Sequence, residues 1–340
     1  MSGKGKGFMW PAVIGLAAAV LFLVIGGYLL ERSAGGAGQE TPGKTVEEIL
    51  GLDKEEEAPV HFNGKQYRKN RDVEAYLLMG VDKMGEAQSS GGYNGGGQAD
   101  VLLLLVVDQE EEIFHALQIN RDTMTDVEVL GVKGDVIGTE YEQICLAHHY
   151  GEGLEDSCGN TVRAVSNLLY GVKIKGYAAI QMEAIPILND MVGGVTVTVE
   201  DDFSSTDPSL IQGETMTLLG EQALHFIRSR MSMEDSSNLN RMERHRAYLH
   251  GFEEAFTAAA REDRELVLKM YDAAHDYMVT DMGSGSISRL AQRCLGYENG
   301  GVVTVEGETE MGERYVEFYP EEDALRQTVL DLFYTEISAD

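Results

Sequence analysis

Beyond residue 72, the first apolar runs of the chain are short and predict β-strands. Residues 75–81 and 113–119 are mostly apolar, and polar residues follow each of them. Between them, residues 101–107 form a continuous run of Val and Leu that is bounded by Asp100 and Asp108. Such a run is typical of a strand that is buried on both faces of a sheet. The acidic turn between 101–107 and 113–119 predicts a hairpin.

Farther along, the spacing of apolar residues alternates between helical and extended patterns. Val162, Val165 and Leu168 recur at helical spacing within 161–169. The same patterns predict strands at 177–182 and 195–199, and helices at 184–191, 218–227 and 239–260. Strands that alternate with helices predict an α/β fold in which helices sandwich a mixed central β-sheet.

The last part of the chain, residues 259–340, contains further elements of both kinds. The patterns predict helices at 266–278, 286–295 and 321–333, and a hairpin formed by 302–305 and 315–318. These elements either form a small added subdomain or complete the cover of the main sheet.

The N-terminal pattern predicts a membrane anchor. Residues 8–30 carry no charge, and as a helix they would measure about 34 Å, enough to cross a hydrocarbon core of roughly 30 Å. A cleaved signal peptide is the alternative, but its apolar core is normally about 7–15 residues long. Lys4 and Lys6 precede the span and only Arg32 lies just beyond it, so the positive-inside rule predicts a cytoplasmic tail at 1–7. We therefore expect a single-pass protein of the cell membrane with its main domain outside the cell.

Residues 31–71 predict an extracytoplasmic linker between this anchor and the body. They include a glycine-rich stretch at 35–38 and the acidic run Glu55–Glu57. The segment has too few apolar residues to build a core of its own.

Positive charge is scarce in this chain but locally concentrated. The sequence has 57 Asp and Glu against 27 Lys and Arg, a formal net charge of −30. Nucleic acid is excluded as a partner, because a chain this acidic is repelled from an extended polyanion. Five arginines nevertheless fall close together, at Arg228, Arg230, Arg241, Arg244 and Arg246. Arginine suits phosphate oxygens, so the cluster predicts a site for phosphate or pyrophosphate, whereas a solvated helix face explains only the last of the five.

Polar residues at the predicted strand ends supply the other candidates, because ligands gather where strands of such sheets end. Asp82 follows the first strand, Asp100 opens the central strand, and Arg121 and Asp122 follow the hairpin strand. Either Asp82 and Asp100 converge on one Mg²⁺ (or Mn²⁺), which takes one or two carboxylates together with phosphate oxygens, or each merely caps a turn.

The chain has three cysteines, at positions 145, 158 and 294. Cys145 and Cys158 flank a glycine-rich turn at 151–153. Outside the membrane a pair can be oxidised, so these two are either bridged or buried as free thiols.

The order of these motifs resembles the LytR-CpsA-Psr family. The strand end at 80–82, the Ala-Asp at 99–100 and the Arg-Asp-Thr at 121–123 are similar to motifs of that family. Later blocks at 147–153, 191–199, 219–230 and 240–245 resemble it as well, and the third of them, Leu-Gly-Glu-Gln-Ala-Leu-His-Phe-Ile-Arg-Ser-Arg, matches nearly throughout. The resemblance covers about 72–258.

The resemblance implies a membrane-anchored phosphotransferase with its catalytic domain at 72–258 and a C-terminal extension at 259–340. Such an enzyme transfers a glycopolymer from a polyprenyl diphosphate carrier to peptidoglycan through a phosphodiester, and the prenyl chain lies in an apolar pocket. Carried over by motif, Asp82 and Asp100 bind the metal, while Arg121 and Asp122 form the catalytic pair. The predicted phosphate-binding set consists of Arg121, Arg228, Arg230, Arg241, Arg244, Lys83, Gln98 and His245.

The main departure from the family pattern is Gln98, because many members have an arginine there. Lys83 compensates in part for that missing charge, and His245 stands where a glutamine often follows the last arginines. Weaker activity or a different lipid-linked substrate is therefore an open alternative. So are two other functions, a non-catalytic protein that binds lipid-linked polymer and a polyprenyl diphosphate hydrolase.

Overall fold

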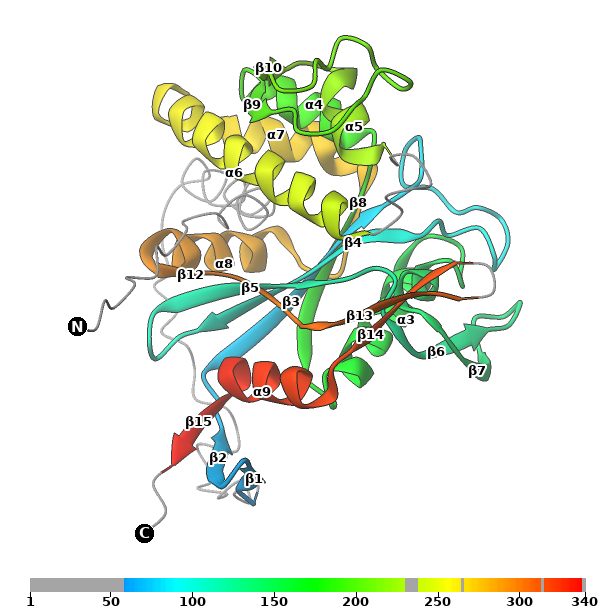
Figure 1. Ribbon diagram of the computed structural model, residues 1–340, viewed down its shortest axis with the longest axis vertical. Coiled ribbons are helices and arrows are strands. Elements are labelled where there is room, and N and C mark those ends of the chain that lie inside the picture. The colour runs from blue at the N-terminus through cyan, green and yellow to red at the C-terminus, as the bar shows by residue number, and fades with distance from the viewer. Residues whose placement is uncertain (1–57, 230–237, 264–265, 313–314, 338–340) are drawn as a thin grey trace, which may run out of the picture.

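The centre of the protein is a six-stranded mixed sheet (Figure 1). A computed structural model describes residues 58–229, 238–263, 266–312 and 315–337. The strand order is β11-β8-β3-β4-β5-β12, with β8 parallel to β3, β12 parallel to β5, and the other neighbours antiparallel. The strands are β3 (Val73–Val81), β4 (Ala99–Asp108), β5 (Ile113–Ile119), β8 (Ile174–Gln181), β11 (Met278–Thr280) and β12 (Glu298–Thr304). The prediction of a mixed central sheet is confirmed.

Strand β4 is buried on both faces, as its continuous apolar run predicts. Side chains alternate across a strand, so Leu103 and Leu105 pack into the core on one face, and Leu102 and Leu104 pack into the core on the other. All four side chains are at most 2% exposed. β4 and β5 pair as the predicted antiparallel hairpin.

Helices cover both faces of the sheet (Figure 1). The first face carries α4 (Ala184–Met191), α5 (Glu221–Arg228), α6 (Asn238–Glu262), α7 (Leu266–Ala274) and α8 (Ser284–Gly296). The second face carries the short helix η1 (Ile144–His148), α3 (Glu155–Leu168) and α9 (Glu322–Phe333). A last short helix, η3 (His275–Tyr277), follows α7.

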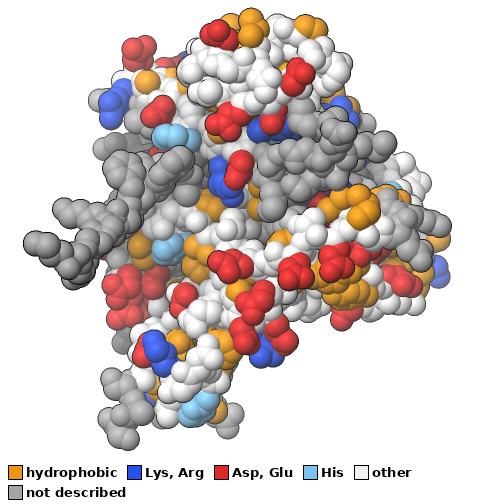
Figure 2. Space-filling model, in the orientation of Figure 1, with side chains coloured by type: hydrophobic (Ala, Val, Ile, Leu, Met, Phe, Trp, Pro, Cys, Tyr) orange, Lys and Arg blue, Asp and Glu red, His pale blue; other side chains and the backbone are white. Residues whose placement is uncertain are grey.

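Smaller sheets surround this core. Three are hairpins, formed by β6 (Met124–Leu130) with β7 (Val136–Gln143), β9 (Val195–Thr198) with β10 (Thr215–Leu218), and β13 (Gly307–Met311) with β14 (Val316–Pro320). The fourth has three strands, β1 (Val60–Phe62), β2 (Lys65–Lys69) and β15 (Tyr334–Ile337). Acidic side chains gather over β13, β14 and α9 (Figure 2), in keeping with the large negative net charge.

The C-terminal part completes the sheet itself. Both edge strands, β11 and β12, come from the segment predicted as an extension, 259–340. The predicted hairpin between 302–305 and 315–318 is wrong, because Val302 pairs with Ala116 of β5, and β14 pairs with β13. Part of the predicted linker is also structured, since β1 and β2 pair with each other and β2 pairs with β15.

The predicted membrane span at 8–30 lies outside the described residues and stays a prediction. Within the described ranges, no helix is both long and apolar enough to span a membrane. Cys145, Cys158 and Cys294 are all described, and all three are buried free thiols. Of the two alternatives for Cys145 and Cys158, the structure therefore shows the unbridged one.

Candidate functional site

Three strand ends meet at one edge of the central sheet. Asp82 follows β3, Asp100 lies near the start of β4, and Arg121 follows β5. The pairing of β3 with β4 shifts register between Gly80 and Val81, so that Val81 pairs with Ala99 and Gly80 with Val101. Asp100 is left without a partner residue on β3, and such an irregularity re-aims the side chain of the extra residue. The register shift therefore leaves the side chain of Asp100 available to contact Arg121.

Arg121 is buried, and acceptors surround its guanidinium. Nη1 donates to Oδ1 of Asp100, and Nη2 donates to Oε1 of Gln98 over 2.6 Å and to Sγ of Cys145 over 3.1 Å. Nε lies 3.3 Å from Oδ1 of Asp122. Burial alone would lower the pKa of Arg121, but Cys145, Asp100 and Asp122 raise it above its usual value. The guanidinium is therefore a fixed positive charge, and the sequence had not indicated the contact with Cys145.

Asp122 is held by residues that no sequence motif indicates. Nε2 of Gln143 donates to Oδ1 of Asp122 over 2.9 Å and to the carbonyl of Val316 over 2.7 Å. The backbone N–H of Phe318 in β14 donates to the carbonyl of Asp122 over 2.9 Å. The C-terminal hairpin thus supports the turn that carries Arg121 and Asp122. No local signal in the sequence links these segments, because nearly two hundred positions separate them in the chain.

Arg228 reaches the same edge of the sheet from α5. Its Nε donates to Oδ1 of Asp82 over 3.0 Å, and its side chain is 47% exposed. Arg228 is the last residue of α5, and an apolar stretch of that helix anchors it, with Phe226 and Ile227 buried in the core. The structure therefore brings together Asp82 with Arg228, and Asp100 with Arg121 and Gln98.

Two predicted phosphate ligands in α6 hold the backbone on either side of Arg228. His245 donates from Nε2 to the carbonyl of Ile227 over 3.1 Å, and Arg244 donates from Nη2 to the carbonyl of Ser229. The guanidinium of Arg244 also forms a 2.8 Å ion pair with Asp201 and is itself buried. These contacts indicate that Arg244 and His245 position Arg228. They do not favour direct phosphate binding by either side chain.

The other predicted ligands differ in position. Lys83 donates from Nζ to the carbonyl of Gln88 over 3.1 Å and so faces the glycine-rich loop 85–97 that connects β3 and β4. Arg230 and the side chain of Arg241 lie outside the described part of the chain, and their phosphate-binding roles stay predictions.

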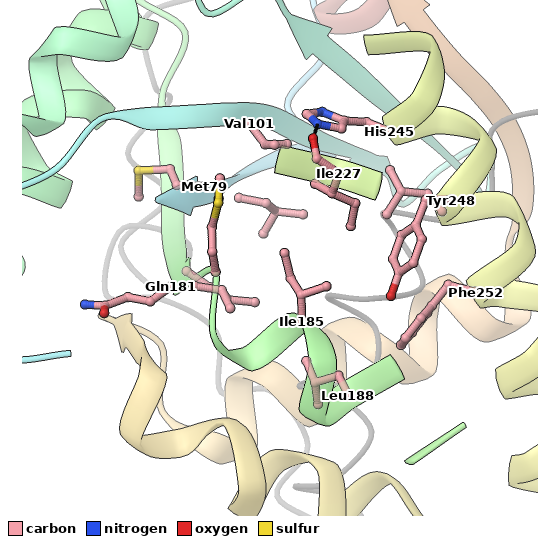
Figure 3. A pocket seen from close by; sticks show the side chains of 15 residues that line it. Met79, Val101, Gln181, Ile185, Leu188, Ile227, His245, Tyr248 and Phe252 are labelled. Carbon is pink, nitrogen blue, oxygen red and sulfur yellow. Dashed lines mark hydrogen bonds between the residues drawn. The ribbon is translucent and has the colours of Figure 1, made fainter. Parts of the chain in front are cut away.

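An apolar cavity opens between the sheet and the helices of its first face (Figure 3). Its volume is about 120 Å³. Residues of β3, β4, β8, α4, α5 and α6 line it, among them Leu78, Gly80, Val101, Ile180, Ile185, Ile227, His245, Tyr248 and Phe252. Gly80 and Val101 are close in sequence to Asp82 and Asp100, and Ile227 directly precedes Arg228. The chain therefore passes within one or two residues from the cavity lining to the charged residues.

The charged residues at this end of the sheet carry a net negative formal charge. The two arginine–carboxylate groups contain three carboxylates, Asp82, Asp100 and Asp122, and two guanidiniums, Arg121 and Arg228. Their formal charges add to −1, so a dianionic ligand would need added positive charge to bind here. Mg²⁺, which typically takes one or two carboxylates together with phosphate oxygens, would supply it, and Asp82 and Asp100 are the carboxylates that could hold it. The described residues contain no cluster of three or more His, Cys, Asp or Glu that would hold a metal by itself.

Comparison with known proteins identifies the family. The model of the LytR_cpsA_psr family matches residues 37–331. This protein belongs to that family. The match extends well beyond the 72–258 that the motifs indicated, because it includes the elements that complete the sheet.

Curated relatives within the LytR-CpsA-Psr family are distant. A protein of Oceanobacillus iheyensis named polyisoprenyl-teichoic acid–peptidoglycan teichoic acid transferase TagU is 28% identical over 241 residues, 70% of this chain and 67% of that protein. A protein of Bacillus anthracis with the same name is 29% identical over 188 residues. That match covers 55% of this chain and only 54% of the relative, little more than half its length.

Solved structures share the fold. The crystal structure of TagT from B. subtilis aligns with a TM-score of 0.55 at 19% identity and covers 77% of this chain and 90% of TagT. A protein from Streptococcus agalactiae aligns with a TM-score of 0.60 at 22% identity and covers 76% of this chain and 88% of that one. At these identities the likeness shows the LytR-CpsA-Psr fold alone.

Proposed function

We propose that this protein is a membrane-anchored phosphotransferase that transfers a glycopolymer from a polyprenyl diphosphate carrier to peptidoglycan through a phosphodiester. The observation that carries the proposal is an apolar cavity whose lining residues Gly80, Val101 and Ile227 lie within two positions of residues in the Asp82–Arg228 and Asp100–Arg121 pairs. A polyprenyl diphosphate has the same division, with an apolar chain joined to a compact anion. An apolar pocket that places a few polar groups at one end is suited to such a ligand.

The names of related proteins support this substrate class. The curated relatives are named as transferases of teichoic acid from a polyisoprenyl carrier to peptidoglycan. One solved TagT structure is described as bound to LI-WTA, and it shares the fold of this chain with a TM-score of 0.58. Together with family membership, these names favour glycopolymer transfer over unrelated reactions of lipid diphosphates.

In the proposed reaction, a hydroxyl oxygen of the acceptor attacks the phosphorus that carries the glycopolymer. The new P–O bond forms as the bridging P–O bond breaks, and the hydroxyl proton ends on the departing polyprenyl phosphate. Phosphoryl transfer depends mainly on positioning and charge neutralisation, so the chain need not supply a covalent intermediate. The leaving group remains in the membrane through its prenyl chain.

Different residues of this chain bind and position the diphosphate in the proposed reaction. Arg121 and Arg228 bind phosphate oxygens, and they exchange their present carboxylate partners for the ligand as it enters. Asp122 orients Arg121, because it contacts Nε while Asp100 and Gln98 contact the other nitrogens. Asp82 and Asp100 would hold Mg²⁺, which supplies further neutralisation of the diphosphate when bound.

A transfer assay tests the proposed function. Full-length protein in detergent would receive a polyprenyl diphosphate-linked glycopolymer with Mg²⁺, with and without a glycan acceptor. We expect polymer on the acceptor and little release of free polymer in its absence. Equal release in both reactions would identify a lipid diphosphate hydrolase, and binding without turnover would identify a non-catalytic binding protein.

A matched pair of arginine substitutions sharpens this assay. Arg121→Lys keeps the charge but loses the planar donors that reach Asp100 and Gln98 together, so transfer should fall by about a hundredfold. Arg163→Lys is the control, because Arg163 donates to Asn160 and Glu128 at the surface of α3 and should leave transfer unchanged.

A further inference from the structure

A second cavity, of about 180 Å³, lies beside α6. Met242, Glu243 and Arg246 of α6 line it. The neighbouring face of the same helix supplies His245 and Tyr248 to the apolar cavity. Helix α6 therefore separates two cavities with different linings, and the proposed function so far uses only one of them.

The two cavities bracket the residues assigned to the diphosphate. Asn120 and Thr123, on either side of Arg121 and Asp122, line the second cavity. Gly80 and Val101, close to Asp82 and Asp100 in the strands, line the apolar cavity. A transfer reaction needs a donor and an acceptor on two sides of the reacting phosphorus, and this arrangement offers one cavity to each.

The C-terminal segment builds a wall of the second cavity. Thr304 at the end of β12 pairs with Gln118 of β5, and both residues line the cavity. Phe318 of β14 lines it as well and is hydrogen-bonded through its N–H to the carbonyl of Asp122. The cavity and the catalytic turn are thus supported by the same strands.

The lining suits a sugar rather than a lipid. Its apolar part includes Ile119, Leu169 and Leu325, while amide and hydroxyl groups of Gln118 and Thr304 supply polar contacts. A pyranose ring presents apolar C–H faces and a rim of hydroxyls, which matches such a mixture. Arg246 adds a donor at the edge, where its Nη1 donates to Oε1 of Gln118 over 3.1 Å and its side chain remains 29% exposed.

We propose that the second cavity is the acceptor subsite and binds a sugar residue of the acceptor glycan. The identification of this sugar as part of the acceptor rests on the proposed function, but sugar binding by the cavity does not depend on it. The first sugar of the donor polymer has the same chemistry and is the competing occupant. Because the cavity lies across α6 from the apolar cavity, we assign it to the acceptor.

The test compares sugar binding and transfer in two variants that alter the cavity differently. Arg246→Ala removes a donor, and Thr304→Trp fills the mouth from an exposed position on β12. Full-length protein in detergent would be titrated with chitotetraose by calorimetry. Loss of a hydrogen bond from a charged group should weaken binding about tenfold, and both variants should raise the KM for a glycan acceptor by a similar factor. The KM for the lipid-linked donor should stay within about twofold of the parent's, a change too small to reflect the loss of such a contact.

Arg261→Ala is the matched control, because Arg261 is an exposed residue of the same helix and lines neither cavity. Chitotetraose that binds parent, Arg246→Ala and Thr304→Trp equally would overturn the inference, as would a rise in the donor KM alone. If the parent transfers polymer in that case, the proposed function still stands. If the parent fails to transfer but its chitotetraose binding is lost in Thr304→Trp, the proposed function fails and the sugar site remains.

Discussion

Arg121 donates from Nη2 to the side-chain oxygen of Gln98 over 2.6 Å. The backbone oxygen of Gln98 in turn accepts from the N–H of Asp82 over 2.9 Å. Gln98 therefore connects the Asp100–Arg121 pair to Asp82 and its partner Arg228. From the sequence alone, Gln98 stands for the loss of a positive charge. In the structure its side-chain oxygen accepts a hydrogen bond from Arg121. An arginine at this position would bring a second guanidinium toward Arg121, and like charges repel at short range.

This contact leads to a prediction for Gln98→Leu. The substitution keeps the approximate size of the side chain but leaves one donor of Arg121 without its acceptor. Hydrogen bonds to charged groups contribute about 1.5–3 kcal/mol, so we expect transfer to fall at least about tenfold while the fold persists. Gln109→Leu, at the opposite end of β4, is the control and should behave as the parent. Unchanged transfer by Gln98→Leu in the same assay would show that Gln98 does not position Arg121.

Asp100 and the metal give a second prediction. Asp100→Asn should lower Mg²⁺-dependent transfer by about a hundredfold or more, because a carboxylate is lost from both the metal and Arg121. EDTA should abolish the activity of the parent, and added Mg²⁺ or Mn²⁺ should restore it. Asp108→Asn is the matched control on the same strand, since Asp108 accepts hydrogen bonds from Asn70 and from turn backbone at the far end. Transfer that is indifferent to EDTA and to Asp100→Asn would refute the metal assignment.

A third prediction separates the placement of Arg228 from its chemistry. Arg244→Met leaves Asp201 without its partner and removes the donor to Ser229, so the free energy of unfolding should fall by about 3 kcal/mol, and transfer should fall with it. Arg228→Met should abolish transfer but cost less than about 1 kcal/mol, because its ion pair with Asp82 is half exposed. Chemical unfolding and transfer would be measured on both variants. Equal stability losses would mean that Arg244 and Arg228 do not differ in role.

The fourth prediction concerns His148, which supports the start of the strand that carries Asp100. Its Nδ1 donates to the carbonyl of Gly96 over 3.0 Å, and burial lowers its pKa to about 4, against about 6.5 in an unfolded chain. Between these values only the unfolded chain binds the proton. The contribution of His148 to the free energy of unfolding therefore rises with pH up to about 6.5 and is constant above.

His148→Asn should remove this part of the pH dependence, up to about 3 kcal/mol between pH 4 and pH 7. The measurement is chemical unfolding of parent and variant at several pH values, compared as a difference. Burial raises the pKa of Glu253 to about 7, so the contribution of Glu253 to the free energy of unfolding falls as the pH rises. Both proteins contain Glu253, so this contribution cancels in the difference. Parallel pH curves for the two proteins would show that His148 is protonated freely in the folded chain.

The features that depend on local spacing could be predicted from the sequence. The continuous apolar run of β4, the hairpin with β5 and the helix at 184–191 all appear where the apolar pattern placed them. The strand ends with Asp82, Asp100 and Arg121 follow from the same elements. Local patterns determine whether a segment is a strand or a helix, and in an α/β sheet the strand ends are where a site forms.

The features that depend on long-range pairing could not be predicted from the sequence. Val302 lies in an apolar run that fits a hairpin equally well, and only the tertiary structure selects its parallel pairing with Ala116. The support of Asp122 by Gln143 and Phe318, and the contact of Cys145 with Arg121, likewise join distant segments. Arg244 and Arg228 are both arginines, so the sequence alone does not distinguish them. In the structure Arg244 is buried against Asp201, whereas Arg228 is half exposed beside Asp82.

The most direct test of the central claim is a crystal structure of the full chain with geranylgeranyl diphosphate and Mg²⁺. We expect the diphosphate to contact Arg121 and Arg228, the metal to be bound by Asp82 and Asp100, and the prenyl chain to fill the cavity beside Tyr248. A diphosphate that binds elsewhere, with this cavity unfilled and both arginines still paired with their carboxylates, would contradict the phosphotransferase mechanism.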